Sequence, residues 1–283
     1  MDALFKKTSY LPPLLLRPYI DRFWTGEGTA AAYAQPTMAA GTGAEMIFQL
    51  KAPMTLVTKE NTVYTPPLQA IYCIRHQHYH ARIHHAHYFI AVRFKAGALR
   101  HFCPVPVADN IEQFPDVCKL YGDDGKRLTE QLQTNASLSQ QLVLISDFLL
   151  RLLQKYHRPH ALVDEAVKQL YYNLEIPDLV SFSDRLGKSY RQFERLFTNN
   201  VGTTPKLFQQ TARLNNTLKY LLTHQIKNYL PVAFDFGYYD QSHFIRACRR
   251  YYGTRPGIIL SPARLDQHCY LSSFSASGSD DKK

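Results

Sequence analysis

The chain has 283 residues, of which 45% are apolar and 20% charged, and its formal net charge is +10. This length is more natural for two domains than for one, and the composition excludes a largely disordered protein. The basic excess favours a polyanionic partner, either nucleic acid or an anionic membrane surface. The charge is densest toward the C-terminus, because residues 181–270 hold 13 Lys and Arg against 5 Asp and Glu.

The five cysteines are widely and irregularly spaced, without a CxxC pair. This spacing argues against a disulfide framework or a zinc ribbon and favours a reducing compartment. The first residues do not resemble a signal peptide, and no apolar run approaches the roughly 20 residues of a membrane span. We therefore expect a cytoplasmic protein that does not engage a membrane.

Residues 1–136 are predicted to form a β-rich domain. Short apolar or aromatic runs, separated by Gly, Pro and Thr, predict strands at residues 45–50, 54–58, 69–74 and 88–94. Residues 96–102 suggest a short helix, and Asp123, Asp124 and Gly125 suggest a turn. Closely spaced short strands of this kind are typical of a barrel or a sandwich.

Residues 137–158 are predicted to form a connector helix that begins after Ser137 and ends before Pro159. One face carries an apolar stripe with the 3-4-3-4 spacing of a helix. Its members are Leu142, Ile145, Leu149, Leu152 and Tyr156. The stripe packs against the β-rich domain in one interpretation and forms a dimer contact in the other.

Residues 159–265 show helical periodicity almost throughout and predict an all-α domain. We expect helices at about 162–174, 178–186, 190–199, 205–222, 228–236 and 241–252. Glycines at or just after four of the predicted helix ends suit the left-handed conformation of a C-cap. They are Gly187, Gly202, Gly237 and Gly253. The polar residues 266–283 predict a disordered tail.

Two segments of this helical region have the pattern of a helix-turn-helix unit, in which a second helix enters the major groove of DNA. In the first unit, residues 187–189 form the turn, Ser189 caps the second helix, and that helix covers residues 190–200. Its inner face holds Phe193, Leu196 and Phe197. Its outer face holds Arg191, Glu194, Arg195 and Thr198.

The same pattern returns about 50 residues later. Residues 228–236 form the first helix, which tolerates Pro231 only because it lies near the N-terminus. Residues 237–240 form the turn, and residues 241–253 form the second helix. Its inner face holds Phe244, Ala247, Cys248 and Tyr251. Its outer face holds Gln241, Ser242, Ile245, Arg246 and Arg249. A helix over 208–223 separates the two units.

The segments LGKSYRQFERLFTNNVGTTP, ARLNNTLKYLLT and FGYYDQSHFIRACRRYYGTRP cover about residues 175–260 and resemble the DNA-binding domain of the AraC/XylS family of bacterial transcription regulators. The long pattern from Gly237 to Pro256 carries most of this resemblance. The sequence departs from the family's usual residues at positions expected to pack in the core. They are Ser183, Thr217, Tyr238 and Cys248.

The resemblance implies a sequence-specific regulator of transcription that binds double-stranded DNA. Carried over by position, base contacts fall on the outer faces of the two second helices. They are Arg191, Glu194, Arg195, Gln241, Ser242 and Arg246. Residues beside these faces are expected to contact phosphates. They are Lys188, Ser189, Arg249 and Arg250.

The N-terminal segments GTGAEMIFQL, AVRFKAGALRHF and KLYGDDGKRLTEQL resemble the cupin-like sensor domain of one subgroup of that family. This implies an α+β protein with a β-rich cupin-like domain, a connector helix and an all-α domain with two helix-turn-helix motifs. A small-molecule effector, RNA polymerase and a second copy of the chain are expected as further partners. We identify no catalytic set and expect no cofactor.

The histidine-rich stretch at residues 75–89 suggests an alternative function. His76, His78 and His80 alternate, so in a strand they would share a face, as the ligands of a transition metal could. The alternative function is a metal-dependent cupin-like enzyme with a helical accessory domain. A polar hairpin explains the same pattern without metal, and we assign no metal ligand between His76 and His87. In a third interpretation the N-terminal domain only dimerises a DNA-binding protein.

Overall fold

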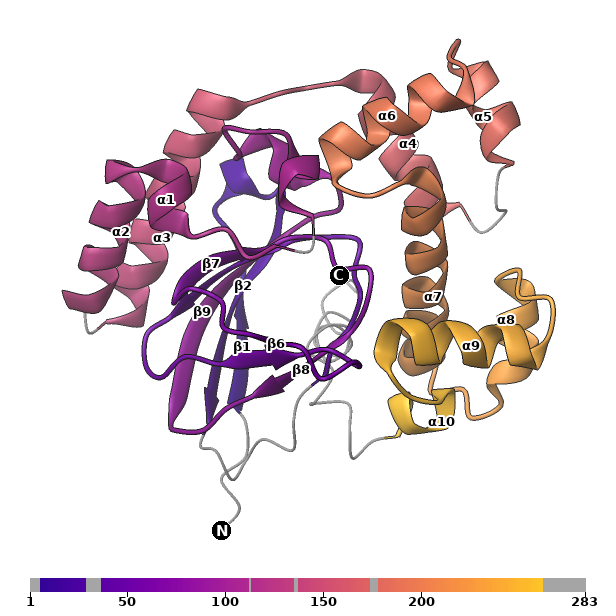
Figure 1. The fold of residues 1–283 in the computed structure, drawn as a ribbon, viewed down its shortest axis with the longest axis horizontal. Helices are drawn as coiled ribbons and strands as arrows, with labels where there is room; N and C mark the ends of the chain where they lie inside the picture. The colour runs from indigo at the N-terminus through magenta and orange to yellow at the C-terminus, as the bar shows by residue number, and fades with distance from the viewer. Residues whose placement is uncertain (1–5, 29–36, 112, 135–136, 174–177, 262–283) are drawn as a thin grey trace, which may run out of the picture.

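The computed structural model describes residues 6–28, 37–111, 113–134, 137–173 and 178–261. A β-rich N-terminal domain lies on one side of the molecule and a helical C-terminal domain on the other (Figure 1). The α+β class expected from the sequence is confirmed. Among the described residues, no helix is both long and apolar enough to cross a membrane.

The N-terminal domain contains two antiparallel sheets. The larger sheet has the order β1 (Lys6–Tyr10), β2 (Ile20–Gly28), β9 (His87–Phe94), β4 (Glu45–Gln49) and β7 (Gln69–Tyr72). The smaller sheet has the order β3 (Thr37–Met38), β8 (Tyr79–Arg82), β5 (Thr55–Val57) and β6 (Val63–Tyr64). Strands β4, β5, β7 and β9 confirm the four strands expected from the sequence.

The larger sheet is buried on both faces at β4 and β7. Along β4, Met46 and Phe48 enter one hydrophobic cluster while Ile47 enters another, as the alternation of a strand requires. The cluster around Ile47 also contains Leu56 and Tyr79 from the smaller sheet, so the two sheets face each other across it. Burial on both faces explains why the three central residues of β4, Met46 to Phe48, are all apolar, without alternation.

Three helices cover the other face of the larger sheet: α1 (Val117–Tyr121), α2 (Asp123–Thr134) and α3 (Leu138–Tyr156). On α3, Ile145, Leu149 and Leu152 are buried in the cluster that contains Phe48, and the rest of the stripe packs against it. The apolar stripe of this helix therefore packs on the β-rich domain.

The turn expected at Asp123, Asp124 and Gly125 is wrong, because these residues begin α2. Two carboxylates in a first turn are favourable next to the positive end of the helix dipole. A Cβ atom on Gly125 would lie 2.4 Å from the carbonyl oxygen of Val117, so this glycine lets α2 approach α1. The short helix suggested at residues 96–102 is present and is the 3-10 helix η3 (Ala98–His101).

The C-terminal domain is entirely helical in the residues that the structure describes. Its helices are α4 (Ala161–Tyr172), α5 (Leu179–Arg185), α6 (Tyr190–Val201), α7 (Pro205–Thr223), α8 (Tyr229–Asp235), α9 (Gln241–Tyr252) and α10 (Pro256–Ile259). They match the expected helices, although the expected end of the first, Leu174, lies outside the described residues, as does the polar tail at 266–283. The short helix α10 was not expected.

Two hydrophobic clusters divide this domain into two units joined by α7. Phe208, near the start of α7, packs with α4, α5 and α6. Leu214, Leu218 and Leu221, further along α7, pack with α8, α9 and α10. One long helix thus belongs to both cores, which fixes the position of one unit relative to the other.

Candidate nucleic-acid interface

The first helix-turn-helix unit consists of α5, a turn and α6. The Asp178 carboxylate accepts hydrogen bonds from the backbone N–H groups of Val180 and Ser181 at the start of α5. The Ser189 hydroxyl caps α6 and forms a capping box with Gln192, as the sequence predicted for Ser189. These caps set where the turn ends and where the second helix begins.

The side of α6 that faces the core is aromatic. Phe193 and Phe197 are fully buried, with ring centroids 5.8 Å apart, and Leu196 is half-buried against the same cluster. These contacts fix the rotation of α6 about its axis, so the remaining side of the helix faces outward.

The predicted base-contacting residues of α6 lie on this outer side. Arg191 and Arg195 are exposed, and Glu194 is half-buried. The Tyr190 hydroxyl donates a hydrogen bond of 3.2 Å to the Glu194 carboxylate, and burial together with Glu194 raises the pKa of that hydroxyl. Glu194 is therefore held in place, whereas both arginines can reach a ligand.

The second unit consists of α8, a turn and α9. Asn228 caps α8, and Pro231 lies in its first turn, where the sequence placed it. The Asp240 carboxylate caps α9 by accepting from the His243 backbone N–H at 2.6 Å. Phe244, Cys248 and Tyr251 are buried, and Ala247 is half-buried, which confirms the inner face expected for this helix.

The outer face of α9 is polar and basic. Gln241, Ser242, Arg246 and Arg249 are exposed, and the Gln241 side chain donates to the Tyr229 hydroxyl at 3.3 Å. Burial, followed by the nearby guanidinium groups of Arg213 and Arg246, lowers the pKa of His243. The first two turns of α9 therefore combine hydrogen-bonding side chains with the positive charge of Arg246.

The residues expected to contact phosphates are also exposed. Lys188 and Ser189 lie in the turn before α6, and Arg249 and Arg250 lie in the last turns of α9. The Arg250 guanidinium rests over the Tyr251 ring at 5.3 Å from its centroid. All ten predicted site residues thus lie on the two second helices or the turn before α6, and only Glu194 is partly covered.

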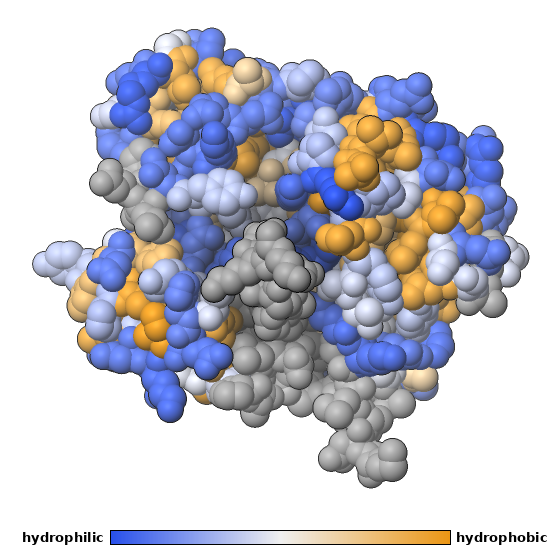
Figure 2. Space-filling view, turned by 180° about the vertical axis from the view of Figure 1, so that it is seen from behind, coloured by the Kyte–Doolittle hydropathy of each residue, from blue (hydrophilic) through white to orange (hydrophobic). Residues whose placement is uncertain are grey.

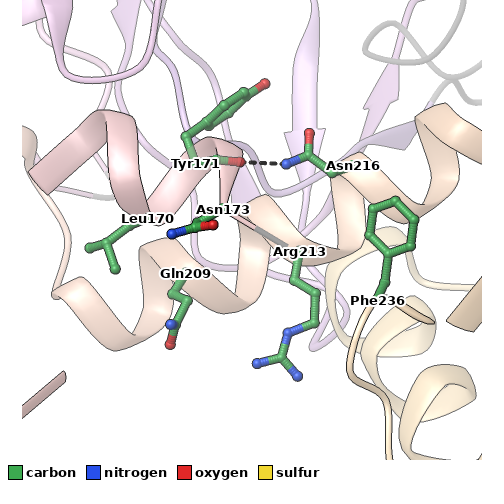
Figure 3. Close-up of a pocket in the computed structure, with 7 residues that line it drawn as sticks. All are labelled: Leu170, Tyr171, Asn173, Gln209, Arg213, Asn216 and Phe236. Atoms are coloured by element: carbon green, nitrogen blue, oxygen red, sulfur yellow. Dashed lines mark hydrogen bonds between the residues drawn. The ribbon is translucent and has the colours of Figure 1, made fainter. Parts of the chain in front are cut away.

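Helix α7 separates the two units and carries no predicted DNA contact. The Arg213 guanidinium donates to the Gly237 carbonyl at 3.1 Å and lies over the Tyr238 ring, so it connects α7 to the second turn. The Asn216 side chain donates to the Tyr171 carbonyl of α4 (Figure 3). The cavity among these side chains measures about 10 Å³, room for about one water molecule.

Both second helices run toward the β-rich domain and contact it near their C-terminal ends (Figure 1). Just past α6, Gly202 lies so close to Val107 that a Cβ atom would be 2.7 Å from the valine Cγ1. At the end of α9, the Tyr251 carbonyl accepts from the Ala40 backbone N–H at 3.0 Å. The first turns of α6 and α9, with Arg191 and Gln241, therefore lie away from the β-rich domain.

Seen from behind, the two units form two lobes separated by a notch, and hydrophilic residues line much of the outer edge of both (Figure 2). Polar outer edges on two lobes are compatible with contact to a charged, hydrated partner.

The histidine-rich stretch does not gather metal ligands in the part of the chain that the structure describes, which holds no group of three or more His, Cys, Asp or Glu side chains suited to a metal ion. His76 and His78 precede β8 and contact the helical domain. His76 bonds the Thr203 hydroxyl at 3.1 Å, and His78 Nδ1 lies 3.3 Å from the Arg250 carbonyl. These histidines form part of the contact between the domains.

One candidate escaped the sequence analysis. Tyr239 lies in the turn before α9 and is 89% exposed, an unusual state for an aromatic side chain. The sequence signal that could have identified it is the pair of adjacent tyrosines in this short turn. Only one of the two, Tyr238, is buried in the core. Its place next to Asp240 and Gln241 adds it to the candidate interface.

Four positions depart from the usual residues of the family that the sequence resembles, and all four are buried, as the resemblance implied. Ser183, Thr217, Tyr238 and Cys248 are each less than 5% exposed. The hydroxyls of Ser183 and Thr217 donate to backbone carbonyls within their own helices, at 2.8 Å in both cases. A buried hydroxyl with a hydrogen-bond partner is tolerated where an alanine is usual.

The fold and the paired units define a two-domain protein whose C-terminal domain is of the helix-turn-helix class. Residues 182–260 match a family described as a helix-turn-helix domain, and residues 8–114 match a domain of unknown function (DUF6597). The comparison therefore places a helix-turn-helix domain in the same residues as the two helix-turn-helix units of the structure.

Among curated proteins, none matches this chain. Solved structures similar to it include ToxT from Vibrio cholerae, at 12% identity and a TM-score of 0.44 over 91% of this chain and 98% of ToxT. An apo ToxT variant has 13% identity and a TM-score of 0.46 over 92% and 97% of the two chains. ToxT with a bound unsaturated fatty acid has 11% identity and a TM-score of 0.44 over 91% of each chain.

Proposed function

We propose that this protein is a transcription regulator that reads two adjacent major grooves of double-stranded DNA with α6 and α9. The observation that carries the proposal is the pair of capped second helices, each with an aromatic inner face and an exposed basic outer face, joined by one long helix. Recognition helices of this class contact base edges with residues near their N-termini, and here both N-terminal turns are uncovered.

Residue chemistry divides the interface into two kinds of contact. Arg191, Arg195 and Arg246 have the planar donor geometry that pairs with guanine, so we assign them to bases. We assign Glu194, Gln241 and Ser242 to bases as well, since carboxylate, amide and hydroxyl groups suit cytosine and adenine edges. Lys188, Ser189, Arg249 and Arg250 are assigned to phosphates, together with Tyr239, whose ring can pack on the sugar–phosphate backbone.

The alternative, a metal-dependent enzyme, has less support. It requires His76, His78 and His80 to converge on one ion, whereas His76 bonds Thr203 and His78 bonds the Arg250 carbonyl. Within the proposal, the β-rich domain is the sensor for a small-molecule effector. RNA polymerase and a second copy of the chain remain proposed partners.

The test begins with in vitro selection of bound DNA by the full chain, followed by affinity measurements on single-base variants of the selected site. The site should contain two base-specific patches about one helical turn apart. Three single variants are compared: Arg191→Ala, Arg195→Ala and Arg246→Ala. Each should lose about 1–3 kcal/mol of binding free energy and relax the base preference at one position of the site. Arg127→Ala, on the distant helix α2, is the matched control and should bind as the wild type does.

A uniform loss of affinity over all sequences in the three arginine variants would contradict the assignment of these residues to bases. A single patch in the selected site would contradict the engagement of both units. Failure of the wild-type chain to select any sequence would contradict the proposed function itself.

A further inference from the structure

A cleft of about 680 Å³ opens between the smaller sheet and the end of the second unit. One wall comes from the β5–β6 region and β8, and the other comes from α9 and the residues that follow it. Six of its lining side chains are basic: Lys59, His78, His80, Arg82, Arg249 and Arg255. None of the described residues that line it is Asp or Glu.

The positive charge in this cleft is not neutralised within the described part of the protein. Two cations lie on each wall: Lys59 and Arg82 on one, Arg249 and Arg255 on the other. In the described part of the chain, none of these four forms an ion pair with a carboxylate. The pKa of His80 is lowered, first by burial and then by the nearby His78 and Arg82, as expected where basic groups crowd together. An anion placed among these groups would relieve their mutual repulsion.

We propose that this cleft binds a compact small molecule that carries two or more phosphate or carboxylate groups. Its volume lies in the range of small-molecule sites. Each wall presents two permanent cations, and Arg82, Arg249 and Arg255 can each hold a phosphate or carboxylate through paired hydrogen bonds. Apolar lining is confined to Val57 and Ile258, which disfavours an acid with a long apolar tail.

Such a ligand would join the two domains at the second recognition helix. Arg249 belongs both to the cleft and to the outer face of α9, where we assign it to a DNA phosphate. Ligand and DNA would therefore compete for the same guanidinium, and each would weaken binding of the other by the same factor. This regulatory step rests on the proposed function, whereas binding to the cleft does not.

The experiment measures calorimetric binding of two probes, sodium tripolyphosphate and citrate, to the full chain. At least one probe should bind saturably, with one molecule per chain. The cleft variant, Lys59→Ala with Arg82→Ala, should bind it at least about tenfold more weakly. The control variant, Lys126→Ala with Arg127→Ala, removes the same charge from exposed positions on α2 and should bind it as the wild type does.

Equal weakening in the cleft and control variants would overturn the proposal, because it would show a response to net charge alone. So would the absence of saturable binding by both probes. Circular dichroism of the cleft variant should match the wild type, since both substituted side chains are exposed.

Affinity for the selected DNA distinguishes the ligand from the nucleic acid itself. Without probe, the cleft variant should match the wild type in affinity and salt dependence. With probe, wild-type affinity should fall more than that of the cleft variant. Weaker DNA binding and a shallower salt slope in the cleft variant without probe would overturn the proposal, since Lys59 and Arg82 would then contact DNA phosphates. Probe binding by a chain that binds no DNA would support the cleft while refuting the proposed function.

Discussion

Substitution of Gly253 by alanine tests how closely the second unit docks on the β-rich domain. Gly253 ends α9 with a φ of +74°, and a Cβ atom there would lie 2.5 Å from Nε2 of His78. The change therefore carries two costs. The left-handed conformation costs an L-residue about 1–2 kcal/mol, and overpacking against a buried side chain adds about 1–3 kcal/mol.

Gly187 separates these two costs. It has a similar φ of +67°, but no atom lies within 4 Å of its ideal Cβ position. Gly187→Ala should therefore show the conformational cost alone. In a His78→Ala background, the excess cost of Gly253→Ala should disappear, because the clashing ring is gone.

The assay is urea unfolding of the full chain followed by two signals. Circular dichroism at 222 nm reports chiefly on the helices, and fluorescence of Trp24, the single tryptophan, reports on the core between the sheets. Equal losses of unfolding free energy for Gly253→Ala and Gly187→Ala would refute the close docking. An excess that persists in the His78→Ala background would refute the assignment of the clash to His78.

Four further outcomes follow from the same structure. Lys188→Ala should weaken binding to all DNA sequences alike and reduce the slope of affinity against salt by about one, whereas loss at a single base position would contradict a phosphate contact. Burial, Arg100 and His157 lower the pKa of His101 from 6.5 to about 4, so between these values the unfolded chain takes up a proton that the native chain does not. Unfolding free energy should fall by about 1–3 kcal/mol as pH falls through this window, and His101→Gln should remove that part of the pH dependence. Leu149→Asp places a carboxylate in a fully buried position and should lower the free energy of unfolding by more than about 4 kcal/mol, measured by Trp24 fluorescence. A near-neutral result would contradict packing of α3 on the sheet. Untagged protein should contain well under one equivalent of any transition metal by elemental analysis, and stoichiometric metal lost on joint substitution of His78 and His80 would restore the enzyme alternative.

The sequence predicted the C-terminal helices well because their signals are local. The capping box of Ser189 and Gln192 lies within four residues, and the left-handed Gly202 directly follows the helix that it ends. Apolar residues at helical spacing likewise identified the buried Phe193 and Phe197. Such signals survive in a single sequence, since each element and its boundaries depend on neighbouring residues.

Elements that depend on distant contacts were missed or misjudged. Strand β3 has only two residues and exists because it pairs with β8, some forty residues further along the chain. The Asp123–Gly125 segment looks like a turn locally, and only the packing of Gly125 against Val117 shows why it is helical. A short polar or glycine-containing segment gives no periodic signal, so its structure follows from tertiary contacts.

The cleft and the contact between the domains share this property. His78 and the Arg250 carbonyl that it bonds are 172 residues apart, and nothing near either residue points to the other. The histidine pattern was visible in the sequence, but its partner was not. The sequence could therefore propose DNA-contacting residues, which lie on locally specified helices, but it gave no sign of the cleft, which requires both domains.

The packing of the two domains gives the β-rich domain a direct part in both helix-turn-helix units. Ile74 and Ala96 belong to the hydrophobic cluster of the first unit, while Ala39 and Ala40 belong to that of the second. Each unit therefore completes its core with residues of the other domain, and separating the domains would expose apolar surface in both units at once. Because each contact lies near the C-terminal end of a second helix, we expect a shift of the β-rich domain to act on both units, whose relative position α7 fixes. We therefore expect an event in the N-terminal domain to reach both proposed DNA-reading helices through these contacts.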